Sequence, residues 1–406
     1  MDEHRPQVAD IFREHGTAFL DQYPASAAQR RVLKDIAACK TAILGGHKAR
    51  CDRCGHEKIF YNSCRNRHCP QCQGAARAQW LVDRTSELLD TPYFHVVFTL
   101  PDELGPLALQ NKEVLYGILF QAASETLLQI ANDPKHLGAH IGFLGVLHTW
   151  GQRLDHHPHL HFVVPGGGLS PDRARWISGR ESFFLPVRVL SRLFRGKFLA
   201  YLRDAIKQGR LKFLESLAGL EDEAHRKSFL SSLARTEWVV YSKAPFGGPK
   251  QVLKYLARYT HRVAISDQRI VSISDGKVTF RYKDYRCGNV QRTMTVEATE
   301  FIRRFLQHVL PASFHRIRYF GFLATRARTK NIALVRKLLC AENADHCETP
   351  PEPQPSTQDS PATDTNSHTK EHLCPSCKKG HLVIVETIKP LFGANAAIRP
   401  AIANTS

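Results

Sequence analysis

Apolar and polar positions along this chain recur with two different periods, and each period predicts one kind of element. In residues 1–40 the apolar side chains recur at helical spacing, with Val8, Ile11 and Phe12 on one face. This region is therefore expected to be helical. The same spacing predicts these further helices: 107–132, 188–220, 297–310 and one that begins near Pro249.

Short runs of β-branched and aromatic residues predict strands. Residues 93–100 form one such run, and residues 141–164 read as two strands joined by a polar turn. Residues 269–285 predict a hairpin that turns at Asp275-Gly276. Helices and strands mix without a regular strand–helix–strand alternation, so the pattern predicts an α+β fold.

The charge of the chain favours a polyanionic partner. Lys and Arg number 56 against 38 Asp and Glu, which gives a net charge of +18. Residues 348–372 are rich in proline and polar residues and carry five acidic side chains against one lysine. They predict a disordered linker, and the rest of the chain is correspondingly more basic, at +22. Nucleic acid is the commonest polyanion that such a surface binds.

The amino terminus and the cysteines bear on the compartment. No apolar signal core opens the chain, and no apolar run reaches the ~20 residues of a membrane span, so we expect a cytoplasmic protein without a membrane partner. Most of the 11 cysteines stand in Cys-x-x-Cys pairs. In a reducing compartment these pairs indicate metal binding rather than disulfides.

A cysteine-rich stretch at residues 51–72 predicts a structural zinc site. Two Cys-x-x-Cys knuckles suit one tetrahedral zinc ion, although Cys64 or His68 could replace one of the four cysteines, and redox cysteines are the alternative. The knuckle cysteines are Cys51, Cys54, Cys69 and Cys72.

A second fragment, Cys374-Pro-Ser-Cys377, resembles half a zinc ribbon. Cys340 and Cys347 could complete it, or the two thiols of the fragment could be unused.

The sequence His159-Leu160-His161 predicts half of a catalytic metal site. Side chains alternate faces along a strand, so both imidazoles point one way and Leu160, with the apolar residues after it, points to a core. A third ligand beside the two histidines would leave coordination positions open for a substrate oxygen. Surface histidines on a sheet are the alternative reading.

Two tyrosines at helical spacing predict a nucleophile. Tyr255 and Tyr259 are four positions apart and therefore lie on one face of a helix. A basic row runs beside them and consists of Lys254, Arg258 and Arg262. Tyrosine is a weak nucleophile at neutral pH, and a divalent ion on a phosphodiester would make its attack feasible. Taken alone, the helix would also suit tyrosines that only pack.

Together these motifs resemble the HUH endonuclease superfamily, and within it the insertion-sequence-91 family of rolling-circle transposases. The resemblance rests on His159-Leu160-His161, on the Tyr255–Tyr259 spacing and on Cys51–Cys72, and it spans roughly residues 10–335. It implies a central antiparallel sheet with flanking helices, preceded by a small zinc module. It implies Mg²⁺ or Mn²⁺ at the histidines and single-stranded DNA as substrate. It also implies cleavage and rejoining at the ends of a mobile element through 5′-phosphotyrosine intermediates.

The resemblance assigns roles to residues and divides the chain. Tyr255 and Tyr259 become the nucleophiles, and His159 and His161 become metal ligands. Gln152, His148 and His157 are candidates for the third ligand, and Gln152 is preferred. The divisions are a zinc-binding region 1–92, a catalytic region 93–340, a linker 341–373 and a tail 374–406.

Basic residues near the end of the folded region, including Arg316 and Arg318, are expected to hold DNA. A plasmid replication initiator or relaxase would use the same chemistry. A non-catalytic zinc-dependent DNA-binding protein is the alternative from another class.

Overall fold

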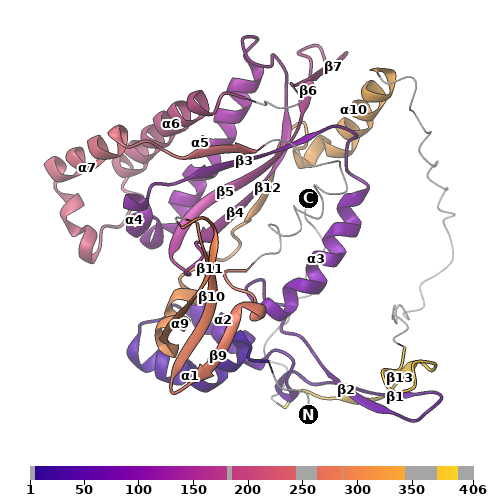
Figure 1. The fold of residues 1–406 in the computed structure, drawn as a ribbon. Helices are drawn as coiled ribbons and strands as arrows, with labels where there is room; N and C mark the ends of the chain where they lie inside the picture. The colour runs from indigo at the N-terminus through magenta and orange to yellow at the C-terminus, as the bar shows by residue number, and fades with distance from the viewer. Residues whose placement is uncertain (1–4, 181–184, 244–262, 286, 343–372, 392–406) are drawn as a thin grey trace.

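A five-stranded antiparallel sheet forms the centre of the fold (Figure 1). The structure is a computed structural model that describes residues 5–180, 185–243, 263–285, 287–342 and 373–391. The α+β class and the central antiparallel sheet predicted from the sequence are confirmed. In spatial order the strands are β12 (Ile317–Gly321), β4 (Gly142–Trp150), β5 (His156–Pro165), β3 (Tyr93–Thr99) and β8 (Val240–Lys243).

Helices cover one face of this sheet and bury its aromatic side chains. Phe98, Phe143 and Phe162 point to this face and are fully buried, with the Phe143 and Phe162 ring centroids 5.0 Å apart. Burial of this apolar surface is what holds the helices to the sheet. The covering elements are η2 (Asp102–Leu104), α4 (Gly105–Gln110), α5 (Lys112–Asn132), α6 (Val187–Lys207), η3 (Glu215–Glu221) and α7 (Glu223–Arg235).

Among the described residues, α5 is the one helix long and apolar enough to cross a membrane. Of its apolar window, 67% is buried inside the fold, as in the core helix of a compact domain.

The opposite face of the sheet is only partly covered. Leu144, Val146 and Val163 point to this face and form a smaller core. His148, His159 and His161 point to the same face. They lie toward the end of β4 and the start of β5, whereas Leu144 and Val163 lie toward the opposite ends of these strands. The elements on this side are α3 (Pro70–Thr85), β6 (Gly167–Leu169), β7 (Trp176–Ser178), η5 (Thr325–Ala327) and α10 (Arg328–Glu342).

A third core joins the start of the chain to its later part. The ring centroids of Phe12 and Phe305 lie 5.2 Å apart in this core. The predicted hairpin turns at Asp275 and Gly276, which have φ angles of 51° and 70°, and a third strand continues it. The elements are α1 (Val8–Gln22), α2 (Ala27–Ala38), η4 (Asp267–Arg269), β9 (Ile270–Ser274), β10 (Lys277–Asp284), β11 (Val290–Glu297) and α9 (Ala298–Leu306).

The helical region predicted over residues 1–40 is two helices. Residues 23–26 separate the two helices, because Pro24 cannot continue α1. Ser26 then begins α2 as its N-cap, and its side chain accepts a hydrogen bond from the backbone N–H of Gln29.

Strands from the N-terminal and C-terminal parts of the chain form a small sheet in the order β13-β1-β2. After the short turn η1 (Ala42–Leu44), the strands β1 (Gly46–Cys51) and β2 (Glu57–Tyr61) form a hairpin. Strand β13 (Leu382–Ile388) pairs antiparallel with the other edge of β1. Figure 1 shows this sheet at the far end of α3 from the central sheet. Residues 343–372 of the predicted linker lie outside the described residues.

Candidate functional site

Three histidines converge on the partly covered face of the central sheet. His159 and His161 lie on β5 with their rings on one face, while Leu160 between them is fully buried on the other. His148 on β4 is the cross-strand partner of His159. One ring nitrogen from each of the three lies within 4.8 Å of the others. Alternation along two paired strands therefore brings together a set that could hold one metal ion.

Two of these rings are oriented by further hydrogen bonds. The Nδ1 of His159 donates to the backbone oxygen of His157, over 2.7 Å, which leaves its Nε2 as the ligand atom. The Nδ1 of His161 lies 2.8 Å from the Nε2 of His95 on β3. Burial, followed by the charge of Lys243, lowers the pKa of His95 to about 4, so this ring is neutral at pH 7 and its Nε2 can accept a hydrogen bond from the Nδ1–H of His161.

His95 was missed in the sequence analysis. Its signal was a single polar residue within an apolar run, at a position whose side chain faces away from the helix-covered core. A lone histidine of that kind does not reveal its partner. The register of β3 against β5 is what brings it beside His161.

Gln152, the preferred third ligand, has its side chain directed elsewhere. Its amide nitrogen donates to the hydroxyl of Tyr285 over 3.2 Å, and its amide oxygen accepts from the backbone N–H of Lys283 over 3.4 Å. His157, another candidate, contacts the carboxylate of Asp102 at 3.2 Å. The turn after β4 carries Gln152 away from the sheet, and His148 joins the two histidines in its place.

The donor set of these histidines fits a divalent ion. Three neutral imidazoles occupy one side of such an ion and leave positions open for phosphate oxygens or water. Mg²⁺ and Mn²⁺ are usually bound by oxygen ligands, so with either ion the phosphate and water would supply the oxygen atoms that the imidazoles do not.

The proposed nucleophiles Tyr255 and Tyr259 lie outside the described residues, as do Lys254, Arg258 and Arg262.

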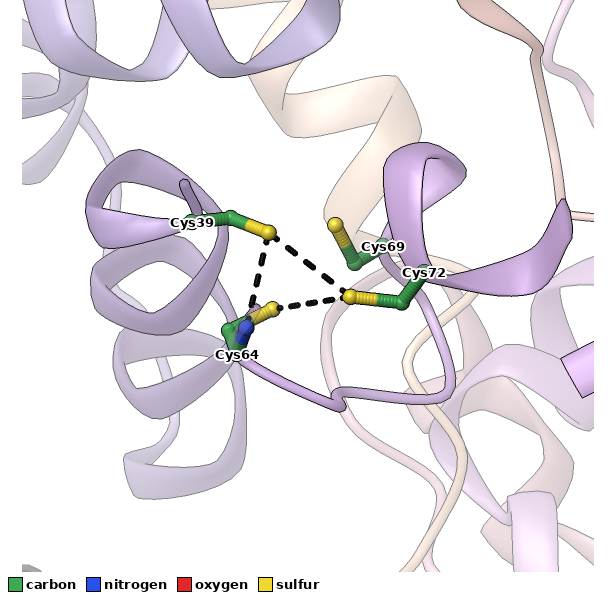
Figure 2. Close-up of side chains that lie close together, drawn as sticks. All are labelled: Cys39, Cys64, Cys69 and Cys72. Carbon is green, nitrogen blue, oxygen red and sulfur yellow. Dashed lines mark hydrogen bonds between the residues drawn. The ribbon is translucent and has the colours of Figure 1, made fainter. Parts of the chain in front are cut away.

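Four cysteines near the start of the chain form a second candidate metal site (Figure 2). The sulfur of Cys72 lies 3.6 Å from the sulfurs of both Cys39 and Cys64. Four thiolates around zinc at the usual bond length of ~2.3 Å would place their sulfurs about 3.8 Å apart, so the spacing fits zinc. Cys39 follows α2, Cys64 lies in a loop, and Cys69 and Cys72 stand at the start of α3. The site therefore ties the first helices to α3.

The grouping of cysteines predicted from the knuckles is wrong. Cys69 and Cys72 pair with Cys39 and Cys64, while Cys51 and Cys54 lie with two cysteines of the C-terminal tail. The Cys-x-x-Cys spacing identified each knuckle correctly, but it could not show which knuckles share an ion. Cys39 has no partner at knuckle spacing, and only the packing of α2 against the loop reveals it.

The remaining candidates of the cysteine region do not join these groups. The His68 side chain is half-buried, and its pKa is lowered to about 3, first by desolvation and then by Arg67 and Arg316. Cys340 belongs to neither four-cysteine group, and Cys347 lies outside the described residues.

The two arginines expected to hold DNA lie at the β12 edge of the sheet. The Arg318 guanidinium stacks on the rings of Phe120 and Phe314, at 4.2 and 5.1 Å from their centroids. Arg316 donates to the side-chain oxygen of Gln73 on α3 over 3.4 Å. Burial and the neighbouring Arg67 lower the pKa of Arg316 to about 10, so it remains charged at neutral pH.

Comparison with known families matches two regions of the chain. Residues 142–331 match a family described as "Putative transposase", and residues 11–100 match one described as "Transposase zinc-binding domain". The first region contains the three histidines, and the second contains the cysteine site of Figure 2.

Two relatives resemble the chain over most of its length. "Putative transposase y4qJ" of Sinorhizobium fredii is 53% identical over 96% of this chain and 97% of its own. The transposase for insertion sequence element IS801 of Pseudomonas savastanoi pv. phaseolicola is 32% identical over 72% of this chain and 69% of its own. Both names agree with the predicted transposase, and neither supports the alternative functions.

Among solved structures, TrwC complexed with a 27-mer DNA shows a distant likeness. It has 14% identity and a TM-score of 0.22 and covers 60% of this chain and 73% of TrwC, a score too low to support an argument. The relatives and the two family matches agree with the resemblance inferred from the histidine, tyrosine and cysteine motifs. The chain therefore belongs to the insertion-sequence-91 family of rolling-circle transposases, which are zinc-binding, DNA-cleaving enzymes.

Proposed function

We propose that this transposase cuts and rejoins single-stranded DNA with Tyr255 and Tyr259 as nucleophiles and with a divalent ion held by His148, His159 and His161. The observation that carries the proposal is the convergence of the three imidazoles within 4.8 Å on the partly covered face of the sheet. The hydrogen bonds of His159 and His161 support it, because metal-binding histidines usually donate their other ring N–H to a fixed acceptor.

The residues that flank the tyrosine segment, residues 244–262, support the proposal that Tyr255 and Tyr259 approach the histidines. Lys243, the last described residue before the segment, pairs across the sheet with His95. Val263, the first described residue after it, is buried, and the neighbouring Ile265 belongs to the core shared by α1 and α9. The described residues on either side of 244–262 are thus fixed in the fold, and Lys243 lies across the sheet from the His95 ring that contacts His161.

The chemistry of the proposed site is a transesterification. The phenol oxygen of a tyrosine attacks phosphorus, and the bond from phosphorus to the 3′ oxygen breaks. The 3′ oxygen takes up a proton and leaves as a hydroxyl, and the 5′ phosphate stays on the tyrosine. A bound divalent ion would supply Lewis-acid polarisation of the phosphate. The protein's own part is to hold the strand in line with the phenol and to keep the imidazoles neutral and fixed.

Two tyrosines suit a reaction with two cleavages. One tyrosine can keep the 5′ phosphate of the first cut while the other makes a second cut. Attack by the freed 3′ hydroxyl on a phosphotyrosine then rejoins the strands without an external energy source, because each ester bond broken is replaced by another.

Basic residues are proposed to bind the phosphates of the strand. These residues are Lys254, Arg258, Arg262, Arg316 and Arg318. Because each phosphate contact releases counterions, affinity should fall steeply with salt.

We also propose that the division between residues 1–92 and 93–340 is one of function rather than of folding. Helices α1 and α2 share a single core with α9, so these parts are expected to unfold together.

Covalent trapping tests the proposal. The full-length protein is mixed with a labelled single strand that carries the element's end, with Mn²⁺, and the products are separated on a denaturing gel. We expect a protein–DNA band that disappears when Tyr255→Phe and Tyr259→Phe are combined. Tyr285→Phe is the matched control, because Tyr285 is an exposed tyrosine near the sheet and should leave the band intact.

The outcomes of the trapping experiment separate the alternatives. A band that persists in the double variant would assign the covalent bond to another residue. Binding without any band on the cognate strand would favour the non-catalytic DNA-binding reading. The same strand in a fully paired duplex should give much less product, and equal product from both would contradict the single-strand requirement.

A further inference from the structure

Four cysteines from opposite ends of the chain form a second cluster, separate from the one in Figure 2. Cys51 ends β1, Cys54 lies in the turn that follows, and Cys374 and Cys377 precede β13. The sulfur of Cys51 lies 3.7 Å from that of Cys377, and the sulfur of Cys54 lies 3.6 Å from that of Cys374. All four sulfurs lie within 4.8 Å of one another.

This spacing fits a single metal ion better than two disulfides. The sulfurs of four thiolates around zinc lie about 3.8 Å apart, close to the two distances found here. A disulfide would join only two sulfurs, at about 2.0 Å, and would not require the other pair to converge on the same point.

The backbone around the sulfurs is arranged to stabilise thiolates. The N–H of Arg53 donates to the sulfur of Cys51 over 3.4 Å, and the N–H of Gly380 donates to the sulfur of Cys377 over 3.3 Å. Such bonds favour the charged form of the sulfur, which is the form that binds metal. The first bond lies within the Cys51–Cys54 turn, and the second comes from the residues that follow Cys377, so each half of the cluster has one sulfur that accepts from the backbone.

Gly380 leaves the space that the second turn needs. A Cβ atom at this position would lie 2.5 Å from the sulfur of Cys51 and 2.4 Å from a carboxylate oxygen of Asp52, closer than real contacts allow. Asp52 in turn accepts a hydrogen bond from the backbone N–H of His381 over 2.8 Å. The turn that contains Asp52 and the turn that contains Gly380 are therefore in contact through the Asp52 carboxylate and the backbone, as well as through the cysteine sulfurs.

Strand pairing continues directly from the cysteine cluster. Cys51 is the cross-strand partner of Leu382, and β1 and β13 stay paired as far as Gly46 and Ile388. The cysteine cluster thus stands at one end of an antiparallel ladder, whose register shifts once, between Lys48 and Ala49.

We propose that Cys51, Cys54, Cys374 and Cys377 bind a second structural zinc ion, which clasps the C-terminal strand β13 onto the N-terminal hairpin. Cys51 and Cys54 lie within the match to the zinc-binding domain, residues 11–100, but Cys374 and Cys377 lie beyond both family matches, so that domain supplies only half of this site. The proposal is independent of the tyrosine chemistry. It predicts that the protein holds about two zinc ions per chain and that removal of one releases β13.

Zinc content of the full-length protein tests the site. Purified protein is dialysed against metal-free buffer, and the number of zinc ions per chain is measured by inductively coupled plasma mass spectrometry. We expect about two zinc ions per chain for the parent and about one for the Cys374→Ser, Cys377→Ser double variant. Cys287→Ser combined with Cys340→Ser is the matched control and should keep both ions, because these cysteines belong to neither cluster. One ion in the parent, or two in the double variant, would overturn the proposal.

Hydrogen exchange tests the clasp and also shows whether the variant has folded. In the double variant the amides of Leu382–Ile388 should exchange faster, while those of His156–Pro165 in the central sheet should keep the protection of the parent. A loss of protection in both segments would mean that the variant is unfolded. In that case the parent, treated with a mild chelator until one zinc ion is released, gives the deciding measurement. Unchanged protection of β13 after loss of that ion would overturn the clasp.

Discussion

We expect His95→Phe to raise the Mn²⁺ concentration needed for half-maximal cleavage by about 10- to 100-fold. His95 is only 4% exposed, and its Nε2 lies 2.8 Å from the Nδ1 of His161. A phenylalanine ring fills the same space but cannot accept the hydrogen bond that keeps His161 in the tautomer protonated on Nδ1. His95 therefore acts as a positioning residue, because it touches a proposed ligand rather than the substrate.

The magnitude follows from the hydrogen bond. A buried bond of this kind contributes about 1 kcal/mol, and leaving its partner without an acceptor costs roughly 1–3 kcal/mol. Since 1.4 kcal/mol is a factor of ten in affinity, the roughly 1–3 kcal/mol cost of the missing acceptor, which already includes the lost bond, corresponds to about 5- to 140-fold, centred on about 10- to 100-fold. If the effect operates through the metal, the cleavage rate at saturating Mn²⁺ should change much less than the half-saturation concentration.

The assay is a Mn²⁺ titration of strand cleavage, followed on a denaturing gel under single-turnover conditions. His95→Gln should recover part of the affinity, because its amide oxygen can accept the same proton. His225→Gln is the control, since His225 is an exposed residue at the start of α7. An unchanged half-saturation concentration in a stably folded His95→Phe protein would refute the reasoning. Equal defects in the phenylalanine and glutamine variants would refute the role of the hydrogen bond.

Three further predictions concern the core, one ion-pair cluster and the DNA surface. Phe162→Ala should lower the free energy of unfolding by about 3–5 kcal/mol, because its ring is fully buried, and a loss below about 1 kcal/mol in a denaturant titration would contradict this. Arg303, and to a lesser extent Arg304, lower the pKa of Glu300 to about 2 from 4.5. This depressed pKa means that the carboxylate stabilises the fold above pH 4.5 and loses that effect as pH falls toward 2. In Glu300→Gln, the free energy of unfolding should therefore fall less between pH 4.5 and pH 2 than in the parent. The difference should be below about 1 kcal/mol, because solvent screens the pair. Arg318→Gln should reduce the slope of log affinity against log salt for a single strand by about 0.7, and an unchanged slope would assign Arg318 to packing alone.

Much of the central sheet was predictable from local pattern. The apolar runs predicted strands at 93–100 and 141–164, and the structure has β3, β4 and β5 there. The alternation of His159 and His161 against Leu160 gave the correct face for each side chain, because successive side chains in any strand point to opposite sides. The turn at Asp275-Gly276 was also predictable, since it depends on two adjacent residues that accept positive φ.

Short edge elements could not be predicted from pattern. Strands β8 and β12 are four and five residues long, and they become strands because a neighbouring strand offers unpaired backbone groups. Local composition carries little of that information. The same holds for β13. Its residues do not alternate between buried and exposed positions, and its partner β1 lies near the other end of the sequence.

The sequence by itself determined the kinds of chemistry in this protein: an imidazole pair on a strand, thiolate knuckles and a tyrosine pair beside basic residues. Only the tertiary structure decided which groups act together. It placed His148 beside His159 and His161, while the Gln152 amide contacts Tyr285, it brought His95 to His161, and it divided the knuckle cysteines between two clusters. The physical reason is that residue type and spacing fix what a side chain can bind and which face it points to. Its neighbours across strands and between chain ends depend on register and packing, which no local spacing encodes.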